Sequence, residues 1–279
     1  MKYVRPKSLP RFKKPPVSEV RIGIVLQPVH LSVTHLPALF EALAEDYPLR
    51  SELPLRPPEL VTERLRRSAF RLELGDTPPL PRIRFTDEGQ TRWIDVQSDS
   101  LTFGWRRSPK GEYPNYKHLR GEFDRIARLF EAFWDKHEEK DDLYIVQAGI
   151  HYYNDFPVAN VASSSDAMCR AFAVQHADRP FGGLPAPTAS GLSFTFDFSA
   201  DDETYAVLAA RADVRVVAGR TVARLNLGYR GDPFMAPVAK AEGPLDVVLG
   251  FLDNGHDRIV LAFTGMTSEE FHSEWERYQ

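Results

Sequence analysis

Two long stripes of apolar residues have the spacing of an α-helix, and they restrict the fold more than any other feature. The first runs from Leu119 through Phe123 to His137 at steps of three or four residues. The second runs from Leu245 to Phe263 at steps of one, three or four residues. Such spacing places the apolar side chains on one face of a helix. We therefore predict two long amphipathic helices, each packed by one face against a sheet.

The second stripe contains a local conflict at Gly255. Asn254-Gly255 followed by the apolar run 258–261 would by itself indicate a turn and a strand. The helical period, however, crosses Gly255 without losing phase. We favour one continuous helix, in which the internal glycine costs about 1 kcal/mol relative to alanine.

Short segments of alternating or β-branched residues precede each long helix, and these are typical of strands. The links between several of them are too short for a parallel crossover. We therefore predict an α+β fold with an antiparallel sheet. The expected strands are 19–26, 69–74, 82–85, 93–97 and 101–105 in the first part, and 143–153, 192–198, 214–217 and 222–229 in the second.

The order of strands followed by a long helix occurs twice, which suggests two similar halves. The expected division is a basic, proline-rich arm at 1–16, a first half at 17–140 and a second half at 141–279. The two halves could equally form one continuous domain. Most of the 22 prolines lie between the predicted elements, where they mark connections.

Composition excludes several classes of protein. No apolar stretch is long enough for a membrane span, and the N-terminus lacks the apolar core of a signal peptide. A cytoplasmic location is therefore expected. The single cysteine, Cys169, excludes an internal disulfide and a cysteine-based zinc site. No cofactor and no metal are predicted.

The net charge of −4 conceals an uneven distribution. The first 14 residues carry six cations and no acid, so the rest of the chain carries an excess of negative charge. Such an arm could contact nucleic acid, or it could dock on the acidic body of the same protein. Its cations are Lys2, Arg5, Lys7, Arg11, Lys13 and Lys14.

The sequence lacks the glycine-rich phosphate loops, the His-Glu-x-x-His pair and the Gly-x-Ser-x-Gly turn that characterise common enzymes. Its weak catalytic candidates are His151 and Asp155, which share one face of a predicted strand. A pocket near this pair would suit an enzyme or a small-ligand sensor. A half-buried sheet histidine is the simpler interpretation.

Aromatic residues are frequent on the predicted strands. Some should line the sheet face away from the helices, where they could form a groove for a peptide, a nucleic acid or another subunit. The candidate binding residues are Trp93, Trp105, Tyr153 and Asn154. Packing beneath covering loops is the alternative for these aromatic side chains.

Several segments in order resemble a sporadically distributed bacterial and archaeal family of about this length that has no assigned function. They are 15–20, 39–48, 101–105, 113–116, 149–154 and 252–267. The resemblance implies an α+β fold with an antiparallel sheet and brings no catalytic residues. The family's Arg-Tyr-x-Asn motif stands here as His151-Tyr152-Tyr153-Asn154.

Together these observations favour a non-enzymatic binding or regulatory protein that acts through a protein partner. The patchy distribution of the family suggests an accessory of an antiviral-defence or mobile-element locus. Homo-oligomers are compatible with this interpretation, and a membrane association is not expected. The alternatives are the enzyme or ligand sensor near His151 and nucleic-acid binding through residues 1–14.

Overall fold

A computed structural model describes residues 8–27, 35–56, 81–109, 111–137, 144–159, 161, 164–172, 189–198, 205–217, 220–235 and 243–279. In these ranges the chain forms one nine-stranded antiparallel sheet and several helices, which confirms the predicted α+β class. The predicted strand 69–74 lies outside the described residues.

The sheet order is β2-β3-β4-β5-β1-β6-β9-β8-β7, so β1 is the central strand and pairs with β5 and β6. Segments from before and after residue 140 therefore belong to the same sheet. The strands are β1 (Val17–Leu26), β2 (Leu49–Leu53), β3 (Arg82–Thr86), β4 (Arg92–Gln97), β5 (Ser100–Arg106), β6 (Ile145–Pro157), β7 (Ala189–Asp197), β8 (Ala206–Val217) and β9 (Arg220–Gly231).

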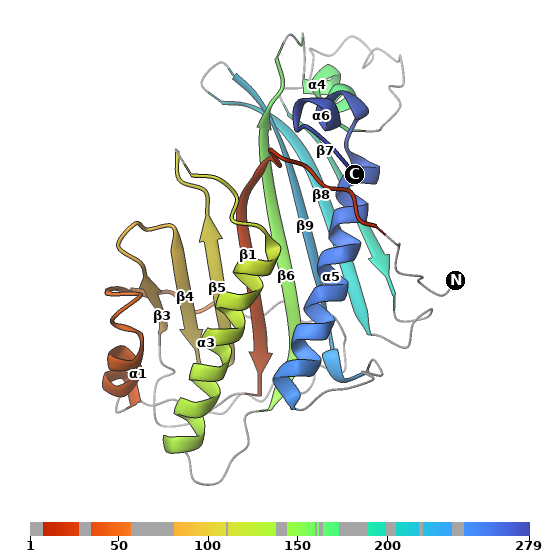
Figure 1. Ribbon diagram of the computed structural model, residues 1–279. Coiled ribbons are helices and arrows are strands. Elements are labelled where there is room, and N and C mark those ends of the chain that lie inside the picture. Colours follow the sequence, from red (N-terminus) through yellow and green to blue (C-terminus); the bar gives the residue numbers. More distant parts are fainter. Residues whose placement is uncertain are drawn as a thin grey trace.

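The two longest described helices lie on the same face of the sheet (Figure 1). Helix α3 packs over β1 and β5, and α5 packs over β6 and β9. The described helices are α1 (Leu36–Leu43), α3 (Tyr116–His137), α4 (Ser164–Ala171), α5 (Pro244–Met266) and α6 (Glu269–Glu274), with a short 3₁₀ turn η2 at Pro233–Met235. None of these helices combines the length and the apolar character that a membrane span requires.

Apolar side chains at alternate strand positions meet the helices and form the core. Ile22 and Ile24 of β1 and Ile150 of β6 are fully or almost fully buried, as are Leu119 and Phe123 of α3. The predicted stripe of α3 therefore packs against β1 and β5. The opposite alternate positions of the same strands face away from these helices.

Helix α5 runs without a break through Gly255, as the helical period predicted. A Cβ atom at this position would overlap the aromatic ring of Tyr229 on β9. Because glycine lacks that atom, α5 can lie close to the sheet, and the tyrosine ring fills the contact. The glycine thus serves helix–sheet packing at the expense of helix propensity.

Two strands differ from the sequence predictions. Strand β2 at the sheet edge was not predicted, since its five residues are mostly exposed and carry no apolar alternation. Strand β8 begins at Ala206, eight residues before the predicted segment 214–217. Its inward positions include Ala206, Ala210 and Ala212, which are buried. Alanine has low strand propensity, so this half of β8 gives a weak sequence signal.

We expect Gly255→Ala to lower the free energy of unfolding by about 1–3 kcal/mol, because the added methyl group displaces the Tyr229 ring. The matched control is Gly250→Ala in the same helix, where a Cβ would meet no atom within 4 Å. That control should gain up to about 1 kcal/mol from helix propensity. Urea unfolding of both variants measures the difference, and equal effects would contradict the packing role.

The turn between β3 and β4 is held by Asp87, which is buried. Its Oδ1 accepts hydrogen bonds from the backbone N–H groups of Thr91 (2.7 Å) and Arg92 (2.9 Å), and its Oδ2 accepts one from the Thr91 hydroxyl (3.0 Å). Burial alone would raise the pKa of Asp87, but the hydrogen bonds from Arg92 and Thr91 outweigh it and lower that pKa.

A lowered pKa in the folded state means that ionised Asp87 stabilises the fold above the unfolded-state pKa of about 3.9. That contribution is lost as pH falls through the folded-state value. We expect Asp87→Asn to cost about 1–2 kcal/mol at neutral pH and progressively less at acid pH. Urea unfolding at a series of pH values measures this, with the exposed neighbour Glu88→Gln as control. A cost that does not change with pH would refute the linkage.

Candidate functional site

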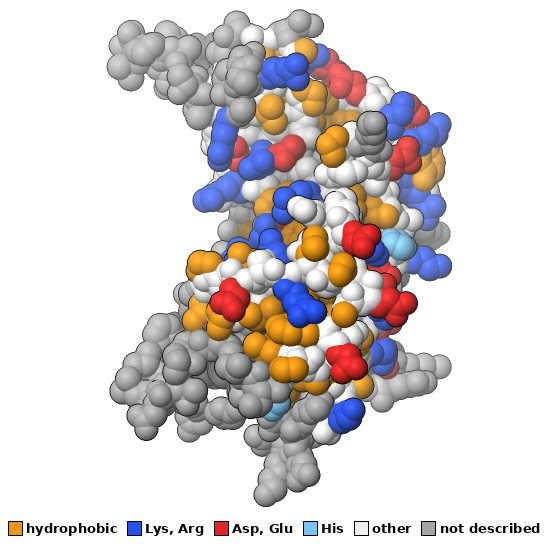
Figure 2. All heavy atoms as spheres, turned by 90° about the vertical axis from the view of Figure 1, so that its left-hand side faces the viewer, with side chains coloured by type: hydrophobic (Ala, Val, Ile, Leu, Met, Phe, Trp, Pro, Cys, Tyr) orange, Lys and Arg blue, Asp and Glu red, His pale blue; other side chains and the backbone are white. Residues whose placement is uncertain are grey.

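The sheet face opposite α3 and α5 is concave. Seen from the side, this face forms a hollow along which Lys and Arg side chains gather (Figure 2). The residues that face it are identified by the strand register, because residues that pair across neighbouring strands share a face. We call this surface the open face.

Arginine is the main charged residue of the open face. The described strands contain no lysine at all. By register, arginines outnumber acids there by nine to five. The arginines are Arg21, Arg82, Arg84, Arg106, Arg211, Arg215, Arg220, Arg224 and Arg230, and the acids are Glu19, Asp95, Asp155, Asp197 and Asp213.

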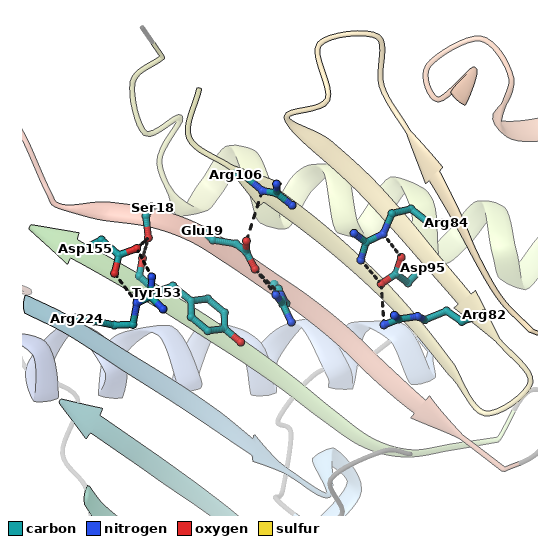
Figure 3. Close-up of polar contacts among 10 residues, drawn as sticks. Ser18, Glu19, Arg82, Arg84, Asp95, Arg106, Tyr153, Asp155 and Arg224 are labelled. Atoms are coloured by element: carbon teal, nitrogen blue, oxygen red, sulfur yellow. Dashed lines mark hydrogen bonds and ion pairs between the residues drawn. The ribbon is translucent and has the colours of Figure 1, made fainter. Parts of the chain in front are cut away.

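One ion-pair cluster lies on β3 and β4. Arg84 forms two parallel hydrogen bonds to Asp95, from Nε to Oδ1 at 2.6 Å and from Nη2 to Oδ2 at 2.7 Å. Arg82 Nη1 lies 3.6 Å from the same carboxylate (Figure 3). The hydrogen bonds to Asp95 raise the pKa of Arg84. One carboxylate thus holds two guanidinium groups in place.

A second cluster joins β1, β6 and β9. Arg224 Nε and Nη2 donate to the two oxygens of Asp155 at 2.6 and 3.1 Å, and Ser18 Oγ donates to Asp155 Oδ2 at 3.0 Å (Figure 3). The hydrogen bond to Asp155 raises the pKa of Arg224. Glu19 is bound in a similar way, since Arg21 donates to it at 2.6 Å and Arg106 lies 3.6 Å from it.

Between these clusters the open face contains a pocket of about 150 Å³. Gly23 and Gly149 pair with each other across β1 and β6 and form part of its lining. Because neither residue has a side chain, nothing projects from the centre of the sheet at this position, and this leaves space for the pocket. Its polar lining includes Arg21, Arg56, Arg82, Gln97, His151 and Arg230.

Two further glycines let rings lie across neighbouring strands. A side chain at Gly104 would overlap the Trp93 ring, and a Cβ at Gly228 would lie 2.5 Å from His151 Nδ1. The guanidinium groups of Arg84 and Arg106 stand 5.0 and 5.2 Å from the centroid of the Trp93 ring. The tryptophan therefore supports two arginines of the open face through cation–π contacts.

The two weak catalytic candidates, His151 and Asp155, share the open face but not a contact that would support catalysis. Four residues along a strand span about 13 Å, which is too far for a hydrogen bond between the two side chains. Both oxygens of Asp155 accept hydrogen bonds from Arg224 and Ser18. The carboxylate is therefore engaged in an ion pair and does not orient the histidine.

The four predicted binding residues divide between the two faces. Trp93 and Tyr153 lie on the open face by register, and Arg21 stands 5.0 Å from the centroid of the Tyr153 ring. Trp105 lies on the helix side, where its ring packs edge-on against Tyr113 at 5.6 Å. Asn154 is also on that side, buried, and donates to the Leu225 carbonyl at 2.9 Å.

The described part of the basic arm docks on the C-terminal segment. Phe12 forms a β-bridge with Arg277, and both Lys13 and Lys14 pair with Glu276. This part of the arm therefore docks on the body of the same protein, where one carboxylate offsets only one of the two lysine charges. Lys2, Arg5 and Lys7 lie outside the described residues, whereas Arg11 is described and exposed.

Within the described ranges, no three His, Cys, Asp or Glu side chains lie together in a way that could hold a metal ion. A scan against protein-family models found no match for this chain, and a search of curated proteins found none. The description of the site therefore depends on its own geometry.

Sequence reasoning expected aromatic residues on the free face of the sheet, and two of them, Trp93 and Tyr153, lie there by register. The signal that it missed is arginine or acid at every second strand position, as in Arg82-x-Arg84 and Arg211-x-Asp213-x-Arg215. Alternation of this kind predicts one charged sheet face. The pairing of distant strands then brings these short patterns together into one surface.

Proposed function

We propose that this protein is a non-catalytic binding protein that holds a nucleic acid against its open face through the phosphate backbone. The observation that carries the proposal is the excess of arginine over acid on a concave sheet face, in a chain whose net charge is −4. Positive charge concentrated on one surface of an acidic protein attracts polyanions to that surface.

The choice of arginine supports phosphate as the group that is bound. A guanidinium group donates in a planar fork that matches the oxygens of phosphate and carboxylate, whereas a lysine ammonium acts as a point charge. Asp95 and Asp155 occupy the Nε–Nη2 edges of Arg84 and Arg224 and hold both side chains in fixed positions, so a phosphate would meet their Nη1 ends. Side chains that are already ordered lose less conformational entropy when a ligand binds.

The polar character of the hollow favours nucleic acid over a protein partner. Protein–protein interfaces place apolar and aromatic side chains at their centre and few charges, whereas interfaces with nucleic acid are polar and strongly positive. The centre of the open face is lined by arginines, glutamine and glycines. Exposed apolar side chains such as Phe194 and Phe196 lie at the β7 edge and do not line this pocket.

Arg211 is the most informative residue to test. It is exposed, lines the open face beside Asn226, and forms no ion pair with any acid of the described residues. We expect Arg211→Ala and Arg230→Ala each to weaken binding of labelled oligonucleotides about three- to tenfold and to reduce the salt slope by about one. Fluorescence anisotropy between about 50 and 200 mM salt measures both quantities.

The oligonucleotides are single-stranded RNA, single-stranded DNA and duplex DNA, so that the preferred form is identified in the same experiment. The control is Arg128→Ala on α3, an arginine on the helix side of the sheet, which should leave binding unchanged. If no oligonucleotide binds the wild-type protein at low salt, the proposal is wrong. Recovery of a specific protein on the open face would then support the predicted protein partner.

Two expectations from the sequence stay predictions. A connection with antiviral defence or mobile elements depends on the family resemblance alone. A catalytic or sensor site around His151 would need a bound ligand in the central pocket, and loss of that ligand in His151→Ala would support it.

A further inference from the structure

A second cavity lies on the helix side of the sheet and has no part in the proposed nucleic-acid site. Its volume is about 570 Å³, which is within the range of pockets that hold small organic molecules. It is bounded by residues 10–17, by the start of α3, by α5 and by the inward residues of β6 and β9. Figure 1 shows the N-terminal segment crossing from β1 to α5 near this position.

Aromatic and aliphatic side chains form the walls of the cavity. Phe12 from the N-terminal segment meets Phe263 of α5 edge-on at 5.6 Å between ring centroids. Tyr116 of α3 stacks on His256 of α5 at 4.0 Å with an interplanar angle of 10°. Val260 also lines the cavity. Aromatic walls of this kind suit an apolar molecule with an aromatic ring, which can meet them edge-on or face-on.

A chain of hydrogen bonds fixes the polar groups at the floor. The Tyr113 and Tyr152 hydroxyl oxygens are 3.0 Å apart, and the Tyr152 oxygen is 3.1 Å from His256 Nδ1. The Tyr116 hydroxyl donates to Asp253 at 2.8 Å. Burial raises the pKa of Tyr113 and of Tyr152, so both phenols stay neutral. These phenols therefore do not repel an anion.

Cations line the cavity as well. Lys13 already pairs with Glu276, at 3.6 Å. Arg11 and Lys117 are exposed, and no acid among the described residues forms an ion pair with either of them. The cavity thus combines an apolar interior with uncompensated positive charge.

We propose that this cavity binds a small molecule with a flat aromatic body and a single anionic group, such as an aromatic carboxylate or sulfonate. The aromatic body lies between the Phe12, Tyr116 and Phe263 rings, and the anion is directed toward Arg11 and Lys117. This proposal does not depend on the nucleic-acid proposal, because its lining residues belong to the other face of the sheet.

Two fluorescent probes that differ by one group test the proposal. The probe 1-anilinonaphthalene-8-sulfonate carries the anion, and N-phenyl-1-naphthylamine has the same rings without it. We expect saturable one-to-one binding of both probes, with the sulfonate bound more tightly. Val260→Trp should fill the cavity and weaken both probes by about tenfold or more. The variant Arg11→Ala/Lys117→Ala should weaken only the sulfonate, by about two- to fivefold.

The matched control is Val247→Trp, which adds the same side chain to α5 at a half-buried position that does not line the cavity. Circular dichroism and thermal unfolding show whether each variant is folded. Probe binding that is unchanged in a folded Val260→Trp protein would overturn the proposal. Equal weakening of both probes in the double variant would overturn the anion assignment. If Val260→Trp does not fold, Val260→Phe repeats the test with a smaller side chain.

Discussion

The pairing of β1 with β6 is the interaction on which the rest of the structure depends. It joins strands from distant parts of the chain into the centre of one sheet. Its inward residues, such as Ile22 and Ile150, form the floor on which α3 and α5 pack. Its outward residues include Arg21, His151 and the Gly23–Gly149 pair. The β1–β6 ladder therefore determines both the residues of the core and the position of the central pocket on the open face.

The charges of the open face show how a dense group of arginines can be accommodated on one surface. Like charges at close range repel, and the cost rises where water is partly excluded. Asp95 and Glu19 each contact two arginines, and Asp155 accepts two hydrogen bonds from Arg224. These contacts reduce the repulsion. The Trp93 ring also contacts Arg84 and Arg106 through its face, which offsets part of their repulsion. The resulting surface is ordered and still carries a net positive charge.

Local periodicity explains which parts of the fold could be predicted from the sequence. The helices around Phe123 and Gly255 were predicted because their apolar spacing persists over many residues. The edge strand β2 and the alanine-rich start of β8 were missed because exposure and small side chains remove the apolar signal. The order of strands across the sheet was not predictable from spacing, since it depends on pairing between distant segments. The open-face clusters were missed for the same reason: Asp155 and Arg224 meet only after β6 and β9 pair.

Strand β6 serves two surfaces at once, and this restricts the kinds of change that it can accept. Tyr152 and Asn154 face the helices, whereas His151, Tyr153 and Asp155 face the hollow. Because side chains alternate with a period of two, an insertion or deletion of one residue would exchange the two sets. Ile150 and Phe156 would then face the hollow, and His151 and Asp155 would enter the core. Over evolutionary time this strand should accept substitutions on either side but conserve its length, so the two surfaces should be inherited together.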